Sequence, residues 1–210
     1  MKPNVIIDKI LPTLNEKDYP LLDLTSILDA SKISQKDFFT VYSNLDDFTI
    51  KAFYQLCAEA DELFKEMGKP TAPLYSLFSN MDELLNLHLK YRFFITNLLE
   101  LIKRHEPIRD RYLDMIAVRK SQLIHLFTQM ATEGFFVKER FPGNFENLST
   151  QIFMLADYWL SHNQSVFGPE DIRLRFYSKL ISSMIVPYLT EKGMAEYKNN
   201  LGYEKEFKLV

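Results

Sequence analysis

Residues 21–48 of the chain are LLDLTSILDASKISQKDFFTVYSNLDDF, and this stretch decides the expected fold. It predicts two short helices joined by a tight turn, which is the pattern of a helix-turn-helix. Asp23 can cap the first helix, because its carboxylate can accept an amide proton of the first turn. Ser34 can cap the second helix over residues 35–42, whose expected buried side carries Phe38, Phe39, Tyr42 and Leu45.

The rest of the chain also favours helices. Hydrophobic residues make up 47% of the 210 positions, and only six positions are glycine. Apolar side chains recur every three or four residues, whereas the alternation typical of strands is scarce. A single cysteine, Cys57, excludes an intramolecular disulfide and indicates a reducing compartment. No apolar run reaches the length of a membrane span. The helical spacing and the single cysteine therefore lead us to expect an all-α protein of the cytoplasm.

Residues 6–48 resemble the N-terminal DNA-binding domain of the TetR family of bacterial transcription regulators. A first helix over residues 6–14 leads into a turn-like stretch at 15–19, where family members commonly have a related sequence. The other matching positions are the turn Lys32-Ile33-Ser34, the recognition-helix aromatics Phe39 and Tyr42, and Asp46-Asp47-Phe48 in place of Glu-Glu-Leu.

This resemblance implies the organisation of the whole chain. A helix-turn-helix head is expected over residues 1–48, followed by a connecting helix over residues 46–67. A glycine and two prolines at residues 68–73 predict a break after that helix. A helical ligand-binding and dimerisation body is expected over residues 70–210.

Four positions of the head differ from the family pattern. Leu28 stands at a position usually held by a small residue, and Lys32 replaces the turn glycine. Lys32 would be strained if that turn requires a positive φ angle. Thr40 and Leu45 replace a tyrosine and a lysine that members commonly use to hold DNA phosphate.

The resemblance implies a double-stranded DNA operator as the partner of the head. The polar residues expected to face DNA are Lys32, Gln35, Lys36, Thr40, Ser43 and Asn44. Lys36 and Ser43 are candidates for phosphate contacts, and Gln35 and Thr40 are candidates for base edges. Repression is the family's commonest mode of regulation.

The charge of the head favours an alternative to the DNA-binding function. Residues 1–70 contain eight lysines and no arginine, against twelve aspartates and glutamates. A DNA-binding domain usually has a positive surface, because neutralising phosphates supplies much of the affinity. The chain could therefore have the TetR fold and act as a ligand-sensing or protein-binding dimer that has lost operator binding.

The body is expected to hold a small, largely apolar effector among aromatic and methionine side chains. The candidate lining residues are Tyr75, Phe78, His88, Tyr91, Phe94, Tyr112, Met115, Phe127 and Trp159. Aromatic residues at helical spacing can equally be ordinary core, and Asp157 can be either a polar end of the pocket or a solvated residue.

The last two long helices, expected over residues 146–164 and 169–190, are apolar on more than one side. TetR-like proteins pair the equivalent helices of two copies into a four-helix bundle, so we expect a homodimer through these ranges. The alternative is a larger monomeric core.

Catalytic patterns are weak in this sequence. None of the four histidines has a partner at metal-ligand spacing, and there is no glycine-rich phosphate loop. Carboxylates around residues 100–114 alternate with lysines and arginines, which is typical of a solvated charged face. We expect no enzyme activity, metal or cofactor.

Overall fold

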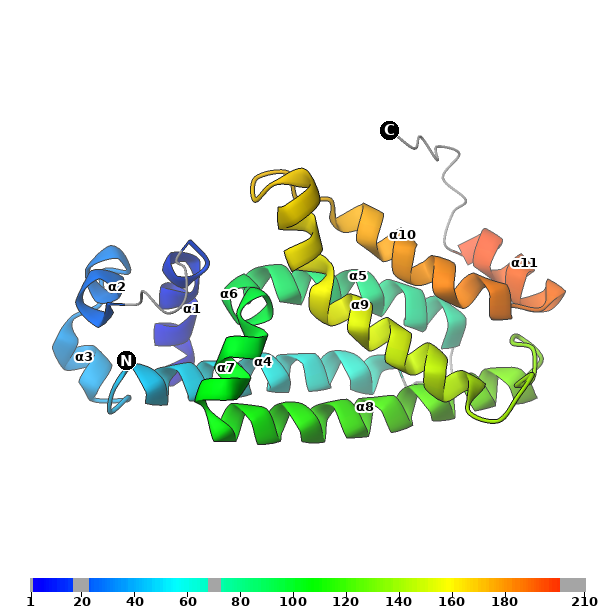
Figure 1. Cartoon of the computed structure of the whole chain (residues 1–210), viewed down its shortest axis with the longest axis horizontal. Coiled ribbons are helices and arrows are strands. Elements are labelled where there is room, and N and C mark those ends of the chain that lie inside the picture. The colour runs from blue at the N-terminus through cyan, green and yellow to red at the C-terminus, as the bar shows by residue number, and fades with distance from the viewer. Residues whose placement is uncertain (1, 17–22, 68–72, 201–210) are drawn as a thin grey trace.

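The computed structural model describes residues 2–16, 23–67 and 73–200, and within these ranges its regular elements are helices. The all-α fold predicted from the sequence is confirmed. Figure 1 shows an elongated molecule, with three short helices at one end and a larger bundle at the other. The expected turn at residues 15–19 and the expected break at residues 68–73 fall mostly outside the described residues.

Three helices form the head: α1 (Pro3–Leu14), α2 (Leu24–Ala30) and α3 (Gln35–Phe39). Both predicted N-caps are confirmed. Asp23 Oδ2 accepts a hydrogen bond from the Ser26 amide at 2.8 Å, and Ser34 Oγ accepts one from the Asp37 amide at 3.0 Å. Each cap satisfies an amide that has no partner within its own helix, so each fixes where a helix begins.

The second helix of the head is shorter than the predicted 35–42. It ends at Phe39, and the amides of Val41 and Tyr42 both donate to the Phe38 carbonyl. Phe38 and Tyr42 are buried as expected, but Phe39 is 51% exposed, so its predicted burial is wrong. Successive helical residues are rotated by about 100°, which turns Phe39 away from the core that Phe38 faces.

Lys32 adopts the left-handed conformation that its position in the turn suggested. Its φ angle is 55°, and among the described residues it is the one non-glycine residue with a positive φ. Its amide donates to the Asp29 carbonyl, and the next amide, of Ile33, donates to the Leu28 carbonyl. The turn thus ends α2 in the way that glycine usually permits.

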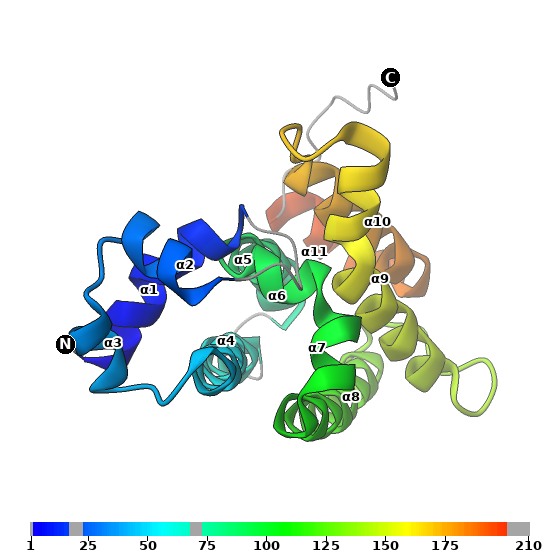
Figure 2. The same ribbon diagram turned by 60° about the vertical axis from the view of Figure 1, so that its left-hand side comes forward.

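The long helix α4 (Leu45–Met67) runs from the head into the body (Figure 1). There it packs against α5 (Pro73–Lys90) and α8 (Glu106–Thr132). Two short helices, α6 (Arg92–Thr96) and α7 (Leu98–Arg104), connect α5 to α8. Figure 2 shows α4 and α8 nearly end-on, with α5 and α6 above α4.

The chain then continues through α9 (Asn144–Phe167), α10 (Leu174–Ile185), a 3₁₀ turn (Val186–Tyr188) and α11 (Glu191–Asn200). The helix predicted over residues 169–190 therefore begins later and ends earlier. The buried Asn163 side chain organises the segment before α10, because it donates to the Gly168 and Asp171 carbonyls and accepts from the Arg173 amide. Pro187 lies in the 3₁₀ turn that follows α10.

No helix within the described ranges is both long enough and apolar enough to cross a membrane.

Candidate functional site

The structure brings the six predicted DNA-facing residues together at one end of the head. Lys32 lies in the turn between α2 and α3, Gln35 and Lys36 lie in the first turn of α3, and the others lie just after α3. All six are exposed: Lys32, Gln35, Lys36, Thr40, Ser43 and Asn44.

Two of these side chains also hold the local backbone. Thr40 Oγ1 donates to the Asp37 carbonyl at 2.6 Å, and Asn44 Oδ1 accepts from the Asp47 amide at 2.8 Å. The second bond caps the beginning of α4. Thr40 therefore stabilises the end of α3, and Asn44 stabilises the beginning of α4, besides being exposed.

The acidic residues beside the head are paired with neighbouring groups. Asp47 accepts from the Ser43 amide at 2.9 Å and from Lys51 Nζ at 3.0 Å. These hydrogen bonds favour the ionised form, led by the Ser43 amide, and they lower the pKa of Asp47. Asp46 lies 3.6 Å from the Arg104 guanidinium, where the body meets the beginning of α4.

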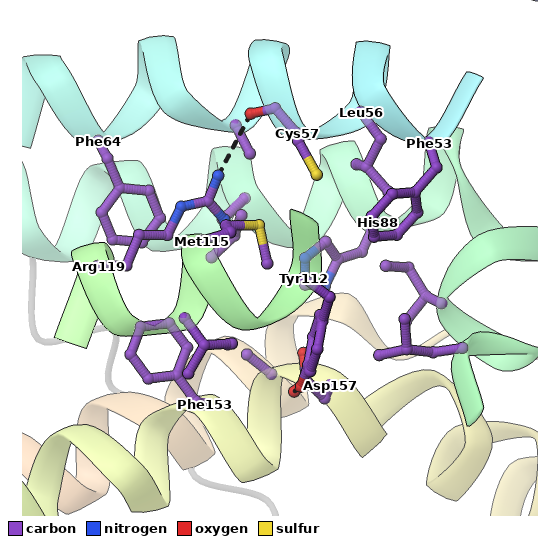
Figure 3. Close-up of a pocket in the computed structure, with 16 residues that line it drawn as sticks. Phe53, Leu56, Cys57, Phe64, His88, Tyr112, Met115, Arg119, Phe153 and Asp157 are labelled. Atoms are coloured by element: carbon purple, nitrogen blue, oxygen red, sulfur yellow. Dashed lines mark hydrogen bonds between the residues drawn. The ribbon is translucent and has the colours of Figure 1, made fainter. Parts of the chain in front are cut away.

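A cavity lies in the body between α4, α5, α8 and α9, with α6 and α7 at one end (Figure 3). Its volume, measured as the space open to the centre of a water molecule, is about 40 Å³. One wall belongs to α4 and consists of Phe53, Leu56, Cys57, Ala60 and Phe64. Facing walls include His88 from α5, Tyr112, Met115 and Arg119 from α8, and Phe153 and Asp157 from α9.

Three of the nine predicted pocket residues line this cavity: His88, Tyr112 and Met115. The other six do not line it, and they are Tyr75, Phe78, Tyr91, Phe94, Phe127 and Trp159. Trp159 lies one layer behind, since its indole Nε1 donates to His88 Nδ1 at 3.2 Å. Tyr75 is 47% exposed, and Phe127 stacks on Phe136 with ring centroids 5.5 Å apart.

The remaining residues of that set also belong to ordinary core packing. Phe78 packs on Tyr197 at 4.9 Å, and Phe94 packs edge-on against Phe93 at 5.3 Å between ring centroids. Tyr91 donates its hydroxyl hydrogen to Glu59 at 2.7 Å. Helical spacing identifies a buried face, but it does not say which buried side chains border an empty space.

Arg119 is the polar group of the cavity that sequence reasoning missed. It is 5% exposed, and its Nη2 donates to Asp61 Oδ1 at 2.9 Å and to the Cys57 carbonyl at 3.3 Å. Its Nε is buried and has no hydrogen-bond partner among the described residues. A signal was available, because Arg119 follows Met115 and precedes Leu123 by four positions, which puts a guanidinium on the apolar face of its helix.

Asp157 forms the opposite polar end of the cavity. Its carboxylate accepts a hydrogen bond from the Tyr112 hydroxyl (Figure 3). Burial raises the pKa of Asp157 from 3.8 to about 6, although Tyr112 and Arg119 oppose that shift. Asp157 therefore changes charge close to neutral pH.

His88 is neutral at physiological pH. Burial, with a contribution from the nearby Arg119 charge, lowers the pKa of His88 from 6.5 to about 4. As a neutral ring, His88 can accept the Trp159 indole proton at Nδ1. Burial also raises the pKa of the Cys57 thiol, so this cavity residue is inert rather than a reactive thiolate.

Contacts near the cavity connect the body to the head. Asn15, at the end of α1, donates from Nδ2 to the Lys90 carbonyl and accepts at Oδ1 from the Phe93 amide, both at 2.9 Å. The Arg92 guanidinium donates to the Asn15 carbonyl at 2.6 Å. The head is thus held at the junction of α5 and α6.

Comparison with known proteins finds a matching family model and several similar solved structures. A family model named TetR and described as a bacterial transcriptional repressor matches residues 55–197. The matched range includes every residue that lines the cavity except Phe53, and it begins after the head. No sequence among the curated proteins matches this chain.

Solved structures resemble the whole chain, including the head. A TetR-family transcriptional regulator from Marinobacter aquaeolei VT8 has a TM-score of 0.75 and 18% identity, with 96% of this chain and 98% of that chain covered. A TetR transcription regulator from Haloarcula marismortui has a TM-score of 0.67 and 18% identity, covering 90% of this chain and 98% of that chain.

A third similar structure is the regulatory protein TetR from Rhodobacter sphaeroides. Its TM-score is 0.66 at 15% identity, with 86% of this chain and 97% of that chain covered. Identities this low carry the fold alone, whereas the family model matches well over half of the sequence. The chain belongs to the TetR family of transcriptional regulators.

Proposed function

We propose that this protein is a dimeric, DNA-binding transcriptional repressor whose body binds a small, largely apolar effector. The observation that carries the proposal is the course of α4. This helix begins directly after the DNA-facing segment of the head and then forms one wall of the cavity. A ligand that moves α4 therefore moves the head, and it shifts the population of head spacings that already exist.

The exposed segment around α3 supports the DNA-binding part of the proposal. In a helix-turn-helix dimer, the recognition helices enter successive major grooves about 34–36 Å apart. Lys36 and Ser43 would contact phosphate, and Gln35 and Thr40 would reach base edges. Lys32 and Asn44 flank these four residues at the two ends of the segment.

The outer faces of α9 and α10 support the dimer. Met154 and Tyr158 are 67% and 57% exposed and lie four residues apart on α9. Phe176 and Leu180 are exposed at the same spacing on α10, whereas the other side of α10 is buried through Tyr177, Ile181 and Ile185. An exposed apolar face on two neighbouring helices is typical of an isologous interface, in which each copy covers the other.

The contacts of Asn15 supply a mechanical connection between effector and DNA. Asn15 joins α1 to the junction of α5 and α6, and Ile95 of α6 lines the cavity. A ligand that displaces α6 would therefore move the end of α1 together with α4. Both connections to the head would then respond to a ligand in the same cavity, which is what a ligand-controlled head requires.

Genomic binding-site selection with the purified protein at low salt tests this function. We expect recovery of inverted half-sites whose centres lie about 10 base pairs apart. Lys36→Ala should weaken binding to all recovered sites, whereas Lys198→Ala on the distant α11 should leave affinity unchanged. Failure to recover any preferred site would count against the proposal.

A second function has a specific observation in its favour. The head is acidic in total, and Thr40 and Leu45 stand where the family commonly has a tyrosine and a lysine that hold DNA phosphate. The protein would then be a ligand-sensing or protein-binding dimer with a head that no longer binds an operator. A protein that is dimeric and binds ligand, but selects no DNA, would favour this function.

A further inference from the structure

The starting point is the buried donor on Arg119. The guanidinium carbon lies 4.6 Å from the centre of the Phe64 ring, and Nη2 is occupied by Asp61 and the Cys57 carbonyl. Nε has no hydrogen-bond partner among the described residues, although it is buried and its residue lines the cavity. A buried guanidinium whose hydrogen-bonding capacity is incompletely used is costly, so the cavity beside Arg119 favours an anionic ligand.

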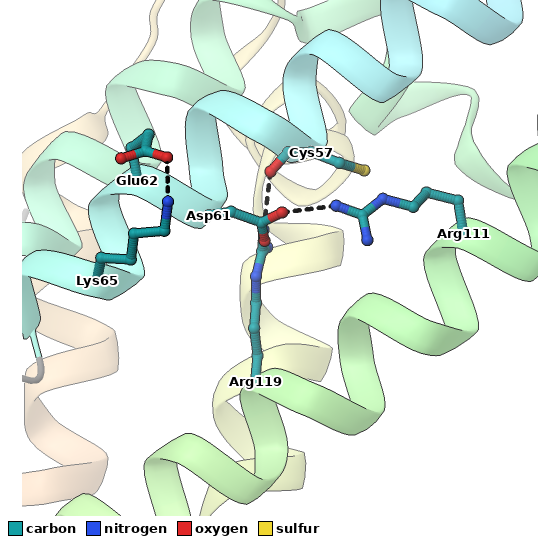
Figure 4. A network of polar contacts seen from close by, with 6 residues as sticks. All are labelled: Cys57, Asp61, Glu62, Lys65, Arg111 and Arg119. Carbon is teal, nitrogen blue, oxygen red and sulfur yellow. Dashed lines mark hydrogen bonds and ion pairs between the residues drawn. The ribbon is translucent and has the colours of Figure 1, made fainter.

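The charges around the cavity favour an anionic acceptor. Arg119 shares the carboxylate of Asp61 with Arg111, whose Nη2 lies 2.6 Å from Asp61 Oδ2 (Figure 4). Two cations thus meet one carboxylate on this side. Among the described residues, Asp157 is the one carboxylate that lines the cavity, and it accepts a hydrogen bond from the Tyr112 hydroxyl.

The other titratable groups of the lining do not compete for this role. His88 on α5 is neutral, and the Cys57 thiol on α4 and the Tyr112 hydroxyl on α8 keep their protons. The lining residues from α6 and α7, Ile95 and Leu98, carry no charge. The two arginines and Asp61 leave one excess positive charge, and protonation of Asp157 removes the negative charge that faces it across the cavity.

We infer that the cavity binds a short monocarboxylic acid, with its carboxylate beside the Arg119 guanidinium, its apolar tail among the aromatic residues, and its accompanying proton on Asp157. The inference rests on the proposed function only in treating this cavity as the effector site. Charge-assisted hydrogen bonds to carboxylate are stronger than neutral ones, which distinguishes an acid from its amide.

The size of the cavity restricts the acid. A volume of about 40 Å³ is small, so the cavity favours a short acid over a long-chain one. Acetate and propanoate are short acids with an apolar tail. No covalent bond changes in the ligand: the anion enters from solution, and one proton from solution binds an oxygen of Asp157.

Titration calorimetry with propanoate and its neutral isostere propanamide tests the inference on the whole protein. At pH 7, in two buffers with different heats of ionisation, we expect propanoate to bind with net proton uptake. Propanamide should bind at least tenfold more weakly and without proton uptake. Equal affinity for the two, no binding of propanoate, or propanoate binding without proton uptake would overturn the inference.

Three variants make the test specific to these residues. Asp157→Asn should bind propanoate at least as tightly as the natural protein and without proton uptake. Arg119→Lys and Arg119→Met should each lose at least tenfold in propanoate affinity, and near-ultraviolet circular dichroism shows whether each is folded. Arg109→Met, at an exposed position of the same helix, is the matched control and should bind propanoate normally.

Retained propanoate affinity in a folded Arg119→Met protein would also overturn the inference. The calorimetry contains no DNA, so its outcome is independent of whether the head binds an operator. Propanoate binding without any effect on the affinity of the protein for DNA would support the inference and count against the proposed regulatory function.

Discussion

Asp61 Oδ1 lies 2.9 Å from Arg119 Nη2, and this ion pair joins the helix that leaves the head to the helix that faces it across the cavity. The second oxygen of Asp61 holds Arg111, about two helical turns earlier on α8 (Figure 4). Arg119 is almost fully buried, whereas Asp61 is partly exposed. One carboxylate therefore fixes the register of α4 against α8 and also orients a cavity residue.

Removing this carboxylate should destabilise the fold. In Asp61→Asn the Arg119 charge stays buried and loses its ionic partner, which costs about 2 kcal/mol in the free energy of unfolding. The value is below that of a fully buried pair, because Asp61 is partly exposed. Urea unfolding of the purified protein measures it.

The matched control is Asp110→Asn, which removes an exposed partner of Arg109 on the same helix. Exposed pairs contribute about 0–1 kcal/mol, so this change should be small. Combining Asp61→Asn with Arg119→Met should recover part of the loss, since no unpaired charge then remains buried. Equal effects of the two single changes would show that the Asp61 pair has no special role.

His88 should make the protein sensitive to acid. Its pKa is about 4 in the folded protein and 6.5 in the unfolded chain, so the unfolded chain takes up the proton first as the pH falls. Stability is therefore lost between pH 6.5 and 4, by about 3 kcal/mol. In His88→Asn, which keeps an acceptor for the Trp159 indole, this loss should disappear from unfolding measurements at several pH values.

Asp157 should make the folded protein less stable as the pH rises, which is opposite to the effect of His88. Its pKa is raised from 3.8 to about 6 in the folded protein, so its contribution to stability is present below about pH 4 and is lost as the pH rises through 6. Asp157→Asn should remove that contribution and make the protein more stable above pH 6. An Asp157→Asn profile parallel to that of the natural protein would contradict the burial of this carboxylate.

Lys32→Gly should stabilise the turn between α2 and α3. The φ angle of 55° is unfavourable for lysine by about 1–2 kcal/mol, and the greater freedom of glycine in the unfolded chain offsets part of the gain. We expect a net increase of about 0.5–1 kcal/mol in the free energy of unfolding. Lys36→Gly, in the helical conformation of α3, should instead lower it by about 1 kcal/mol.

A charge on the outer face of α9 or α10 should separate the proposed dimer. Met154→Glu or Leu180→Glu would bury carboxylates in the interface, and analytical ultracentrifugation should then report a monomer. Leu113→Glu is the control, because Leu113 is 56% exposed on α8, away from that face. Dimers that persist in both interface variants would place the contact between copies elsewhere.

Much of the fold was predictable because local rules decide it. The caps at Asp23 and Ser34 use side-chain oxygens three residues ahead of the amides they hold, and such spacing is visible in a sequence. The positive φ of Lys32 was raised only as a condition, because the resemblance to the family places this residue at the turn glycine. Helix ends were less predictable: the delayed beginning of α10 depends on Asn163, a residue of the preceding helix.

The cavity was harder to predict than the helices around it. Periodicity correctly indicates that Trp159 and Phe127 are buried, yet both lie outside the cavity lining. Whether a buried side chain borders a space depends on how several helices pack, which no single helix encodes. The contribution of α4 was missed for the same reason, because Cys57 and its neighbours have the pattern of ordinary core.

The most direct test of the central proposal is the salt dependence of binding to a DNA fragment recovered by selection. We predict an affinity that falls steeply as salt rises, with a slope of log affinity against log salt that is about one unit smaller for Lys36→Ala. Propanoate should weaken binding of the natural protein to that fragment. Absence of binding to any selected fragment at low salt would contradict the account of this protein as a DNA-binding regulator.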